Sequence, residues 1–245
     1  MFFRQHKDHT TLLVVYVDDI IIIGNNEGEI AQLKVQLGKE FEVKNLGLLQ
    51  YFHLIAVARG TGVLSQRKYV LDLLTETGML GCRPLASPID PKIKLTELVA
   101  EKVDRDRYQK LVGRLIYLTH TRPDISFAVH VVSRPMRDPR KDHMDAVYQI
   151  LRYLKGAPGK GLIFRKHGHF NIEGYCDSDW ASCADDRKSI SGYFMFVGGN
   201  LVSQKTRKQL VVAWSTADTE YRAIAVGVAE ILWLRTLLIE LRMNQ

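Results

Sequence analysis

The sequence is poor in cysteine and in long apolar runs, and each shortage excludes a class of protein. Its three cysteines are an odd number without metal-ligand spacing, which argues against a disulfide scaffold and favours a reducing compartment. The longest apolar run, residues 12–23, is interrupted by Asp18 and Asp19 and is too short to cross a bilayer. Charged residues occupy the N-terminus where a signal peptide has its apolar stretch. We therefore expect no membrane partner and no secretion.

Positive charge, by contrast, is in excess. The chain has 245 residues, 46% of them hydrophobic, and a net charge of +7 from 34 Lys and Arg against 27 Asp and Glu. This length accommodates one large domain or two small ones. Residues 131–170 hold nine Lys or Arg against three Asp, a surplus of six. A polyanionic partner would explain this distribution, and so would a solvated surface that keeps the protein soluble.

Hydrophobic spacing predicts a mixture of helices and strands. Two apolar, β-branched runs flank Asp18 and Asp19, which predicts a β-hairpin over residues 11–24 with the acidic pair at its tip. A second pair of strands is expected over residues 48–58 and 62–65. Helical spacing of apolar residues occurs over residues 29–41, 68–76, 106–118, 125–133 and 142–155.

The pattern changes near residue 168, where we place a domain boundary. Strand-like runs cover residues 170–177, 191–197 and 201–205, and one long helix is expected over residues 217–241. The residues predicted to line the buried side of this helix are Tyr221, Ile224, Ala225, Val228, Leu232 and Leu238.

The adjacent carboxylates Asp18 and Asp19 are the first candidates for chemistry. Aspartate is a poor strand residue, yet this pair interrupts two strongly β-forming runs. Carboxylates at a rigid tip suit a hard divalent cation, although a simple turn would also accept them. A complete site needs a third carboxylate from another strand, and the preceding sequence offers only Asp8, in a polar leader predicted not to be a strand.

A second candidate pair is Asp177, at the end of a predicted strand, and Glu220, in the first turn of the last helix. The order of strand, hairpin, strand and helix can bring the two carboxylates together for metal-assisted phosphodiester hydrolysis. The alternative is that Glu220 only complements the helix dipole, behind a capping pair formed by Ser215 and Asp218.

Long blocks of the sequence resemble the Pol polyprotein of copia-type LTR retrotransposons, in family order and across nearly the whole chain. The first blocks are LLVVYVDDIIIIG (12–24), LGLLQYF (46–52), QRKYVLDLLTETGML (66–80), RYQKLVGRLIYLTHTRPDISFAV (107–129) and ILRYLKGAPGKGL (150–162). The later blocks are GYCDSDWAS (174–182), SGYFMFVGGNLVSQKTRKQ (191–209) and STADTEYRAI (215–224).

This resemblance implies an α+β fold in three parts. Residues 1–65 would be the C-terminal part of a reverse-transcriptase palm, with its hairpins, and residues 66–168 the helical thumb and connection. Residues 169–245 would be a truncated RNase H-like domain, with a three-stranded sheet and one long helix. The family acts in cytoplasmic particles and its products reach the nucleus, which leaves the compartment of this chain open.

The resemblance also implies roles for individual residues. Asp18 and Asp19 would be metal carboxylates of the polymerase, and Asp177 and Glu220 metal carboxylates of RNase H, with Asp179 as the substitute for Asp177. The implied cofactor is Mg²⁺, with no small-molecule cofactor, and the implied partner is an RNA/DNA template–primer or RNA–DNA hybrid. The basic residues expected to contact its phosphates are Arg134, Arg137, Arg140, Lys141, Arg152, Lys155 and Lys160.

Departures from the family pattern shape the functional expectation. The fingers and a further polymerase aspartate would precede residue 1, and the rest of RNase H would follow residue 245. A partial set of carboxylates binds Mg²⁺ poorly. We therefore expect a fragment that is inactive alone and retains nucleic-acid binding. The alternatives are an active polymerase and RNase H completed by a partner chain, a pure binding or interaction module, or no function. The template, host role and oligomeric state stay open.

Overall fold

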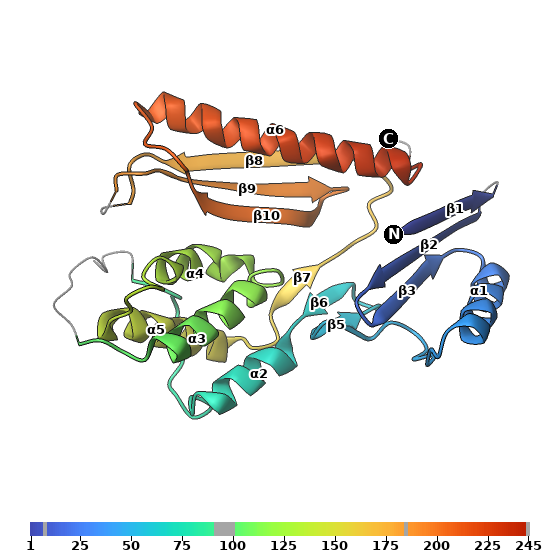
Figure 1. Cartoon of the computed structure of the whole chain (residues 1–245), viewed down its shortest axis with the longest axis horizontal. Coiled ribbons are helices and arrows are strands. Elements are labelled where there is room, and N and C mark those ends of the chain that lie inside the picture. The colour runs from blue at the N-terminus through green and yellow to red at the C-terminus, as the bar shows by residue number, and fades with distance from the viewer. Residues whose placement is uncertain (7–8, 91–100, 184–185, 244–245) are drawn as a thin grey trace. The chain divides into compact units, whose positions relative to one another are not determined.

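The computed structural model describes residues 1–6, 9–90, 101–183 and 186–243 (Figure 1). The chain divides into two compact units, Met1–Gln50 and Tyr51–Gln245. Helices alternate with three small sheets, which confirms the mixed helix-and-strand class that the sequence predicts. Within the described part of the chain, no helix combines the length and apolar character needed to span a membrane.

The first unit is a three-stranded antiparallel sheet with one helix. Strands β1 (Phe2–His6), β2 (His9–Tyr16) and β3 (Asp19–Gly24) lie in that order, and α1 (Glu27–Glu40) follows. The predicted hairpin is therefore present as β2 and β3.

The prediction that the polar leader is not a strand is wrong, because β1 pairs with β2 along its whole length. β1 is an edge strand, so the N–H and C=O groups along one of its edges pair with no other described strand. Such a strand tolerates polar residues such as Arg4 and Gln5. Asp8, the only carboxylate upstream of the hairpin, lies outside the described residues.

Polar contacts fasten α1 to the sheet. The side chain of Asn26 caps the helix by accepting a hydrogen bond from the backbone N–H of Glu29 at 3.2 Å. The hydroxyl of Thr11 donates to a carboxylate oxygen of Glu29 at 2.7 Å. Among the described residues of this unit, Thr11 is the one buried side chain, and α1 buries none. The described residues of the first unit therefore form no apolar core of their own.

The second unit begins with a small sheet in the order β4, β5, β6, β7. The strands are Tyr51–Phe52, Ile55–Ala58, Val63–Ser65 and Gly161–Ile163. Strand β7 was not predicted, because residues 157–161 carry only chain-breaking signals. Its position depends on pairing with β6, where a Cβ at Gly161 would come within 2.1 Å of the Leu64 carbonyl oxygen. Only glycine permits this approach.

The predicted helices are present as α2 (Arg67–Glu76), α3 (Arg105–Leu118), α4 (Ser126–Ser133) and α5 (Lys141–Gly156), with a 3₁₀ turn at Pro123–Ile125 before α4. Their apolar stripes meet in the main core of the molecule, and α5 buries seven side chains. Fully buried members of this core include Leu73, Leu74, Tyr108, Leu115, Leu118, Ile150, Leu151 and Leu154.

Arg122 and Asp124, in the turn before α4, form an ion pair that also contacts the end of α5. Arg122, 1% exposed, donates two hydrogen bonds of 2.9 Å to the carboxylate of Asp124 and a third to the carbonyl oxygen of Ala157. Tyr153 and Lys160 also donate to Asp124. Burial pushes the pKa of Asp124 upward, but the hydrogen bonds from Arg122 and its neighbours outweigh burial and hold that pKa well below its usual range.

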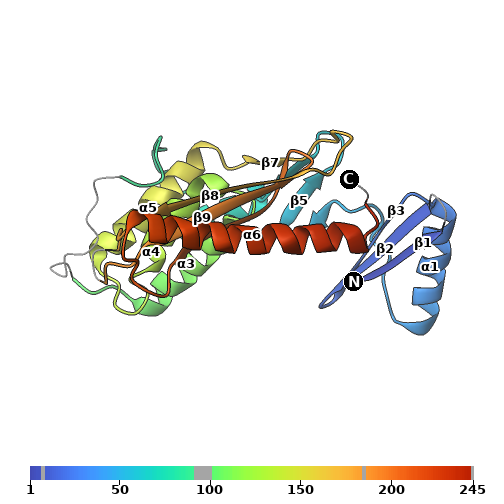
Figure 2. The same ribbon diagram turned by 90° about the horizontal axis from the view of Figure 1, so that it is seen from above.

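The second unit ends with a three-stranded antiparallel sheet in the order β10, β9, β8. Its strands are β8 (Ile172–Asp179), β9 (Ile190–Val197) and β10 (Asn200–Lys208), and α6 (Thr216–Glu240) lies along one face (Figures 1 and 2). A Cβ at Gly227 of α6 would come within 2.1 Å of Cys176 Sγ, and one at Gly174 of β8 within 2.8 Å of Ile231. Small residues thus let helix and sheet pack closely.

The prediction for the buried side of α6 is wrong for most of its residues. Its buried residues are Thr219, Ala223, Gly227, Leu234 and Leu238. Exposed large apolar side chains on the helix include four of the predicted ones, namely Tyr221, Ile224, Val228 and Leu232. The helix is apolar around most of its circumference, so spacing alone could not identify the side that the sheet covers. The side with small residues such as Gly227 and Ala223 packs against the sheet, because small residues let the helix lie close to the strands.

Candidate metal and nucleic-acid sites

The β2–β3 hairpin presents its two carboxylates at an exposed tip. Tyr16 pairs with Asp19, so Val17 and Asp18 form a two-residue turn and Asp19 begins β3. Val17 has φ = 50°, in the left-handed region that β-branched residues avoid. Such strain costs about 1–3 kcal/mol and clusters at functional sites. The tip is as the sequence predicts, with Asp18 exposed and Asp19 half-buried.

Asp177 and Glu220 belong to the same sheet–helix pair. Gly174 and Cys176 of β8 face α6, and side chains alternate along a strand, so Asp177 and Asp179 lie on the opposite face of the sheet. Asp177 accepts a hydrogen bond from the backbone N–H of Ser178 at 2.9 Å. Glu220 is half-buried in the first turns of α6.

The predicted capping pair of α6 is confirmed. The Ser215 hydroxyl oxygen accepts from the backbone N–H of Asp218 at 3.2 Å, and the Asp218 carboxylate accepts from Trp214 N–H and Arg222. Hydrogen bonds from Trp214 and Arg222 lower the pKa of Asp218. Glu220 is therefore not needed as a cap, although its carboxylate still lies near the positive end of the helix dipole.

The donor sets fit a divalent metal only in part. Asp18 with Asp19, and Asp177 with Glu220, supply the carboxylate oxygens that Mg²⁺ prefers. Among residues 1–6, 9–90, 101–183 and 186–243, however, no group of three or more His, Cys, Asp or Glu side chains is placed to hold one ion. Neither pair amounts to a complete metal centre.

The seven predicted phosphate-binding residues lie on α5 and on the segments that follow α4 and α5. Two of them are engaged internally, because Arg140 pairs with Asp138 at 2.7 Å and Lys160 pairs with Asp124 at 3.2 Å. The other five form no salt bridge with any described residue, and all but Lys155 are exposed: Arg134, Arg137, Lys141, Arg152 and Lys155. Their charge is therefore available to an external anion.

The sequence predictions missed His130 and Gln204, which line a pocket between α3, α4 and strands β9 and β10. Burial, together with the charges of Arg134 and Lys208, lowers the pKa of His130 to about 4. One signal was available in the sequence, because His130 is the single polar residue in the run FAVHVV. Nothing marks Gln204, whose role depends on contacts that are distant along the chain.

Residues 1–91 match the family model described as reverse transcriptase (RNA-dependent DNA polymerase). The chain is 39% identical to an uncharacterized mitochondrial protein of Arabidopsis thaliana, and the match covers 90% of this chain and 93% of that protein. It is 38% identical to the retrovirus-related Pol polyprotein from transposon RE1 of Arabidopsis thaliana, over 98% of this chain and 17% of the polyprotein.

A third relative is the retrovirus-related Pol polyprotein from transposon TNT 1-94 of Nicotiana tabacum, at 37% identity over 100% of this chain and 19% of the polyprotein. The chain thus spans less than a fifth of the length of these two polyproteins. No solved structure matches the chain.

Proposed function

Since this chain belongs to the reverse-transcriptase family of copia-type retrotransposon Pol polyproteins, we propose that it binds a template–primer or RNA–DNA hybrid through the sugar-phosphate backbone. The observation that carries the proposal is a group of five basic residues on α5 and in the segment after α4. They have no carboxylate partner among the described residues, and we call them the α4–α5 basic group. Phosphate contacts from Lys and Arg dominate the affinity of proteins for nucleic acids.

In this proposal the parts of the chain keep the roles that the resemblance implies. Residues 1–65 act as part of the palm, residues 66–168 as thumb and connection, and residues 169–245 as the RNase H-like part. The helices of the second unit share one buried core, so they can hold the basic side chains in fixed positions. A rigid array of this kind suits a regularly spaced polyanion.

Divalent metal use is general among reverse transcriptases, and Asp18 and Asp19 would hold part of such a centre. A bound metal pair supplies activation of the attacking hydroxyl and stabilises charge on the departing oxygen. The hairpin holds the two aspartates at adjacent positions, with Asp18 exposed and Asp19 half-buried. Because the described carboxylates form no complete ligand set, we propose that the chain on its own has little or no polymerase or RNase H activity.

A second candidate function is catalysis completed by another chain. The exposed hairpin tip favours it, because the two-residue turn leaves Asp18 accessible to such a partner. In this case a partner supplies the remaining carboxylates, and the two proposals differ in whether added protein restores activity.

Two experiments test the proposed function. The first measures binding of a labelled RNA–DNA hybrid by a variant that carries Arg134→Glu, Arg137→Glu and Lys141→Glu, with Lys34→Glu, Lys39→Glu and Lys44→Glu in the first unit as the matched control. We expect loss of binding only in the former. Equal affinity of both variants would contradict the proposal.

The second experiment is primer extension on an RNA template with Mg²⁺, with an Asp18→Ala/Asp19→Ala variant as the background. We expect no extension above that background by the chain alone. Extension that depends on both aspartates would overturn the proposed inactivity, and extension only after addition of a polyprotein segment would favour the second candidate.

A further inference from the structure

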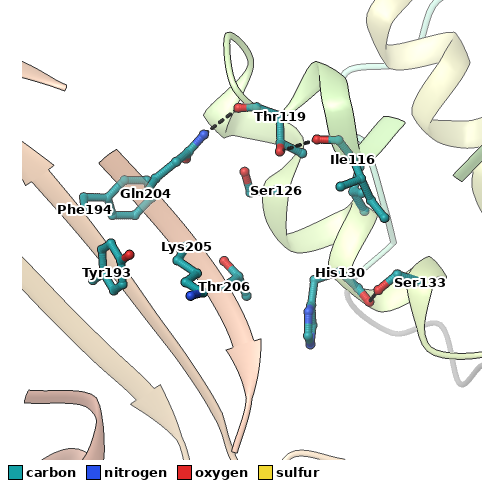
Figure 3. A pocket seen from close by; sticks show the side chains of 11 residues that line it. Ile116, Thr119, Ser126, His130, Ser133, Tyr193, Phe194, Gln204, Lys205 and Thr206 are labelled. Carbon is teal, nitrogen blue, oxygen red and sulfur yellow. Dashed lines mark hydrogen bonds between the residues drawn. The ribbon is translucent and has the colours of Figure 1, made fainter. Parts of the chain in front are cut away.

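A pocket of about 250 Å³ opens within the second unit, between helices α3 and α4 and strands β9 and β10 (Figure 3). The helices contribute Thr119 and His130 to its lining, and β10 contributes Gln204, Lys205 and Thr206. Polar side chains thus face one another across a junction between a helical layer and a sheet.

Two buried polar atoms of this pocket have no hydrogen-bond partner among the described residues. They are Nε2 of His130 and Oε1 of Gln204. The orientation of the Gln204 amide is fixed, because its nitrogen donates to the carbonyl oxygen of Thr119, which can only accept. A buried polar atom without a partner costs about 1–3 kcal/mol. Both atoms therefore indicate a ligand that supplies the missing hydrogen bonds.

The charges around the pocket indicate what kind of ligand it is. Arg134 and Lys208 act on His130 electrostatically. Arg134 is exposed, and Lys208 pairs with Asp186 at 3.0 Å. This environment attracts an anion. Gln204 Oε1 can only accept a hydrogen bond, so the ligand must also carry a donor. A phosphate next to a sugar hydroxyl combines both properties, and the 2′-hydroxyl is the donor that RNA has and DNA lacks.

The register of the sheet places this pocket on the same face as Asp177. Asp177 on β8 pairs with Gly192 on β9, and Gly192 pairs with Thr206 on β10. The three residues form one row across the sheet, and two strand spacings separate its ends by roughly 10 Å. A backbone that occupies the pocket can therefore continue along the face that carries Asp177.

We propose that the pocket binds one ribose–phosphate unit of an RNA strand, with Gln204 and His130 contacting the ribose hydroxyl and Arg134 the phosphate. This inference rests on the proposed function, because it assigns the site by which the chain distinguishes RNA from DNA. The α4–α5 basic group supplies affinity for either nucleic acid, and the pocket adds a preference for RNA.

The test measures binding of the full chain to a labelled RNA and to DNA of the same sequence by fluorescence anisotropy. We expect wild type to bind RNA roughly five- to tenfold more tightly, the effect of one or two net hydrogen bonds. Gln204→Met and His130→Phe should reduce RNA affinity to the DNA level and leave DNA affinity unchanged. Arg134→Ala should weaken both. Gln149→Met is the matched control, because it removes a similar amide contact to a carbonyl outside the pocket.

Competition with adenosine monophosphate distinguishes a phosphate of the RNA backbone from the phosphate of a free nucleotide. Failure of this nucleotide to displace the RNA supports a backbone site, and complete displacement at equal phosphate concentration would overturn it in favour of a free nucleotide. An unchanged RNA-to-DNA ratio in folded Gln204→Met and His130→Phe variants would overturn the pocket and leave the proposed function intact. Wild type that binds neither nucleic acid would overturn the proposed function itself.

A measurement on the wild-type chain removes the dependence on variant folding. RNA that contains 4-thiouridine is cross-linked by ultraviolet light, and the modified peptides are mapped by mass spectrometry. We expect cross-links in residues 126–133 and 200–208. Cross-links confined to other segments would overturn the assignment.

Discussion

The two units of the molecule are stabilised in different ways. In the second unit, α5 contributes six buried side chains to a core shared with α2, α3 and α4. In the first unit, α1 buries none, and strands and helix are joined by the backbone ladder and contacts such as Thr11 to Glu29. Apolar burial contributes roughly 25 cal/mol per Å². The candidate polymerase carboxylates therefore lie on the less stable unit, and the basic residues on the more stable one.

The largest expected effect comes from Arg122. Arg122→Ala leaves the Asp124 carboxylate half-buried without its bidentate partner and should lower the free energy of unfolding by about 3–5 kcal/mol. The matched change in the first unit is Arg4→Ala, which removes an exposed ion pair with Glu29 and should cost under about 1 kcal/mol. Urea unfolding of both variants measures the two losses of free energy. Equal losses would contradict the difference between the two units.

The same ion pair predicts how stability depends on pH. The pKa of Asp124 is lower in the folded state than in the unfolded state, so its contribution to stability is complete above the unfolded pKa near 4. That contribution is lost as the pH falls below this value toward the folded pKa. In Arg122→Ala the loss of unfolding free energy on acidification should be smaller. Unfolding curves recorded at decreasing pH from about pH 5 would measure it.

Truncation of leucine tests where the apolar core lies. Leu115 is fully buried, and Leu115→Ala should cost about 2–5 kcal/mol because it leaves a cavity between α3 and its neighbours. Leu46 in the first unit is 78% exposed, and Leu46→Ala should change stability by less than about 0.5 kcal/mol. A large loss for Leu46→Ala would show that the first unit buries more than the structure indicates.

The orientation of α6 can be tested with two neighbouring leucines. Leu234→Lys places a charge against the sheet and should cost several kcal/mol, about 3 or more. Leu232→Lys introduces the same side chain on the outer surface and should cost under about 0.5 kcal/mol. Thermal unfolding of the two variants measures both losses. A larger loss for Leu232→Lys than for Leu234→Lys would support the buried side that hydrophobic spacing predicts.

The remaining prediction concerns the titration of His130. Its folded pKa of about 4 lies below the unfolded value, so the unfolded chain binds the proton first as the pH falls. The stability that neutral His130 contributes is complete above about pH 6.5 and decreases toward pH 4. His130→Gln should flatten the decrease in melting temperature over this range. An unaltered pH profile would show that His130 is not buried as described.

The elements that could be predicted from sequence are those whose signals are local. Helices α2, α3 and α5 each have one apolar stripe, and the β2–β3 hairpin has two β-branched runs around a turn. Strands β1 and β7 depend on partners elsewhere in the chain, so their sequences alone do not identify them. The buried side of α6 was also decided by its partner, because Gly227 and Ala223 permit closer packing than the larger residues.

The candidate sites follow the same division. The carboxylate motifs and the basic residues are visible in sequence because their residue types and spacing are local. The lack of a third ligand beside each carboxylate pair among the described residues, and the orphaned atoms of His130 and Gln204, depend on tertiary contacts. Arg140 and Lys160 also pair with internal carboxylates, which no count of charges reveals.

The central claim is that the α4–α5 basic group holds a nucleic-acid backbone. Its most direct test is the affinity of the full chain for an RNA–DNA hybrid measured against salt concentration. If two to five of these cations contact phosphates, the logarithm of the affinity should fall with the logarithm of salt at a slope of about −2 to −4.5. A slope near zero would contradict the account.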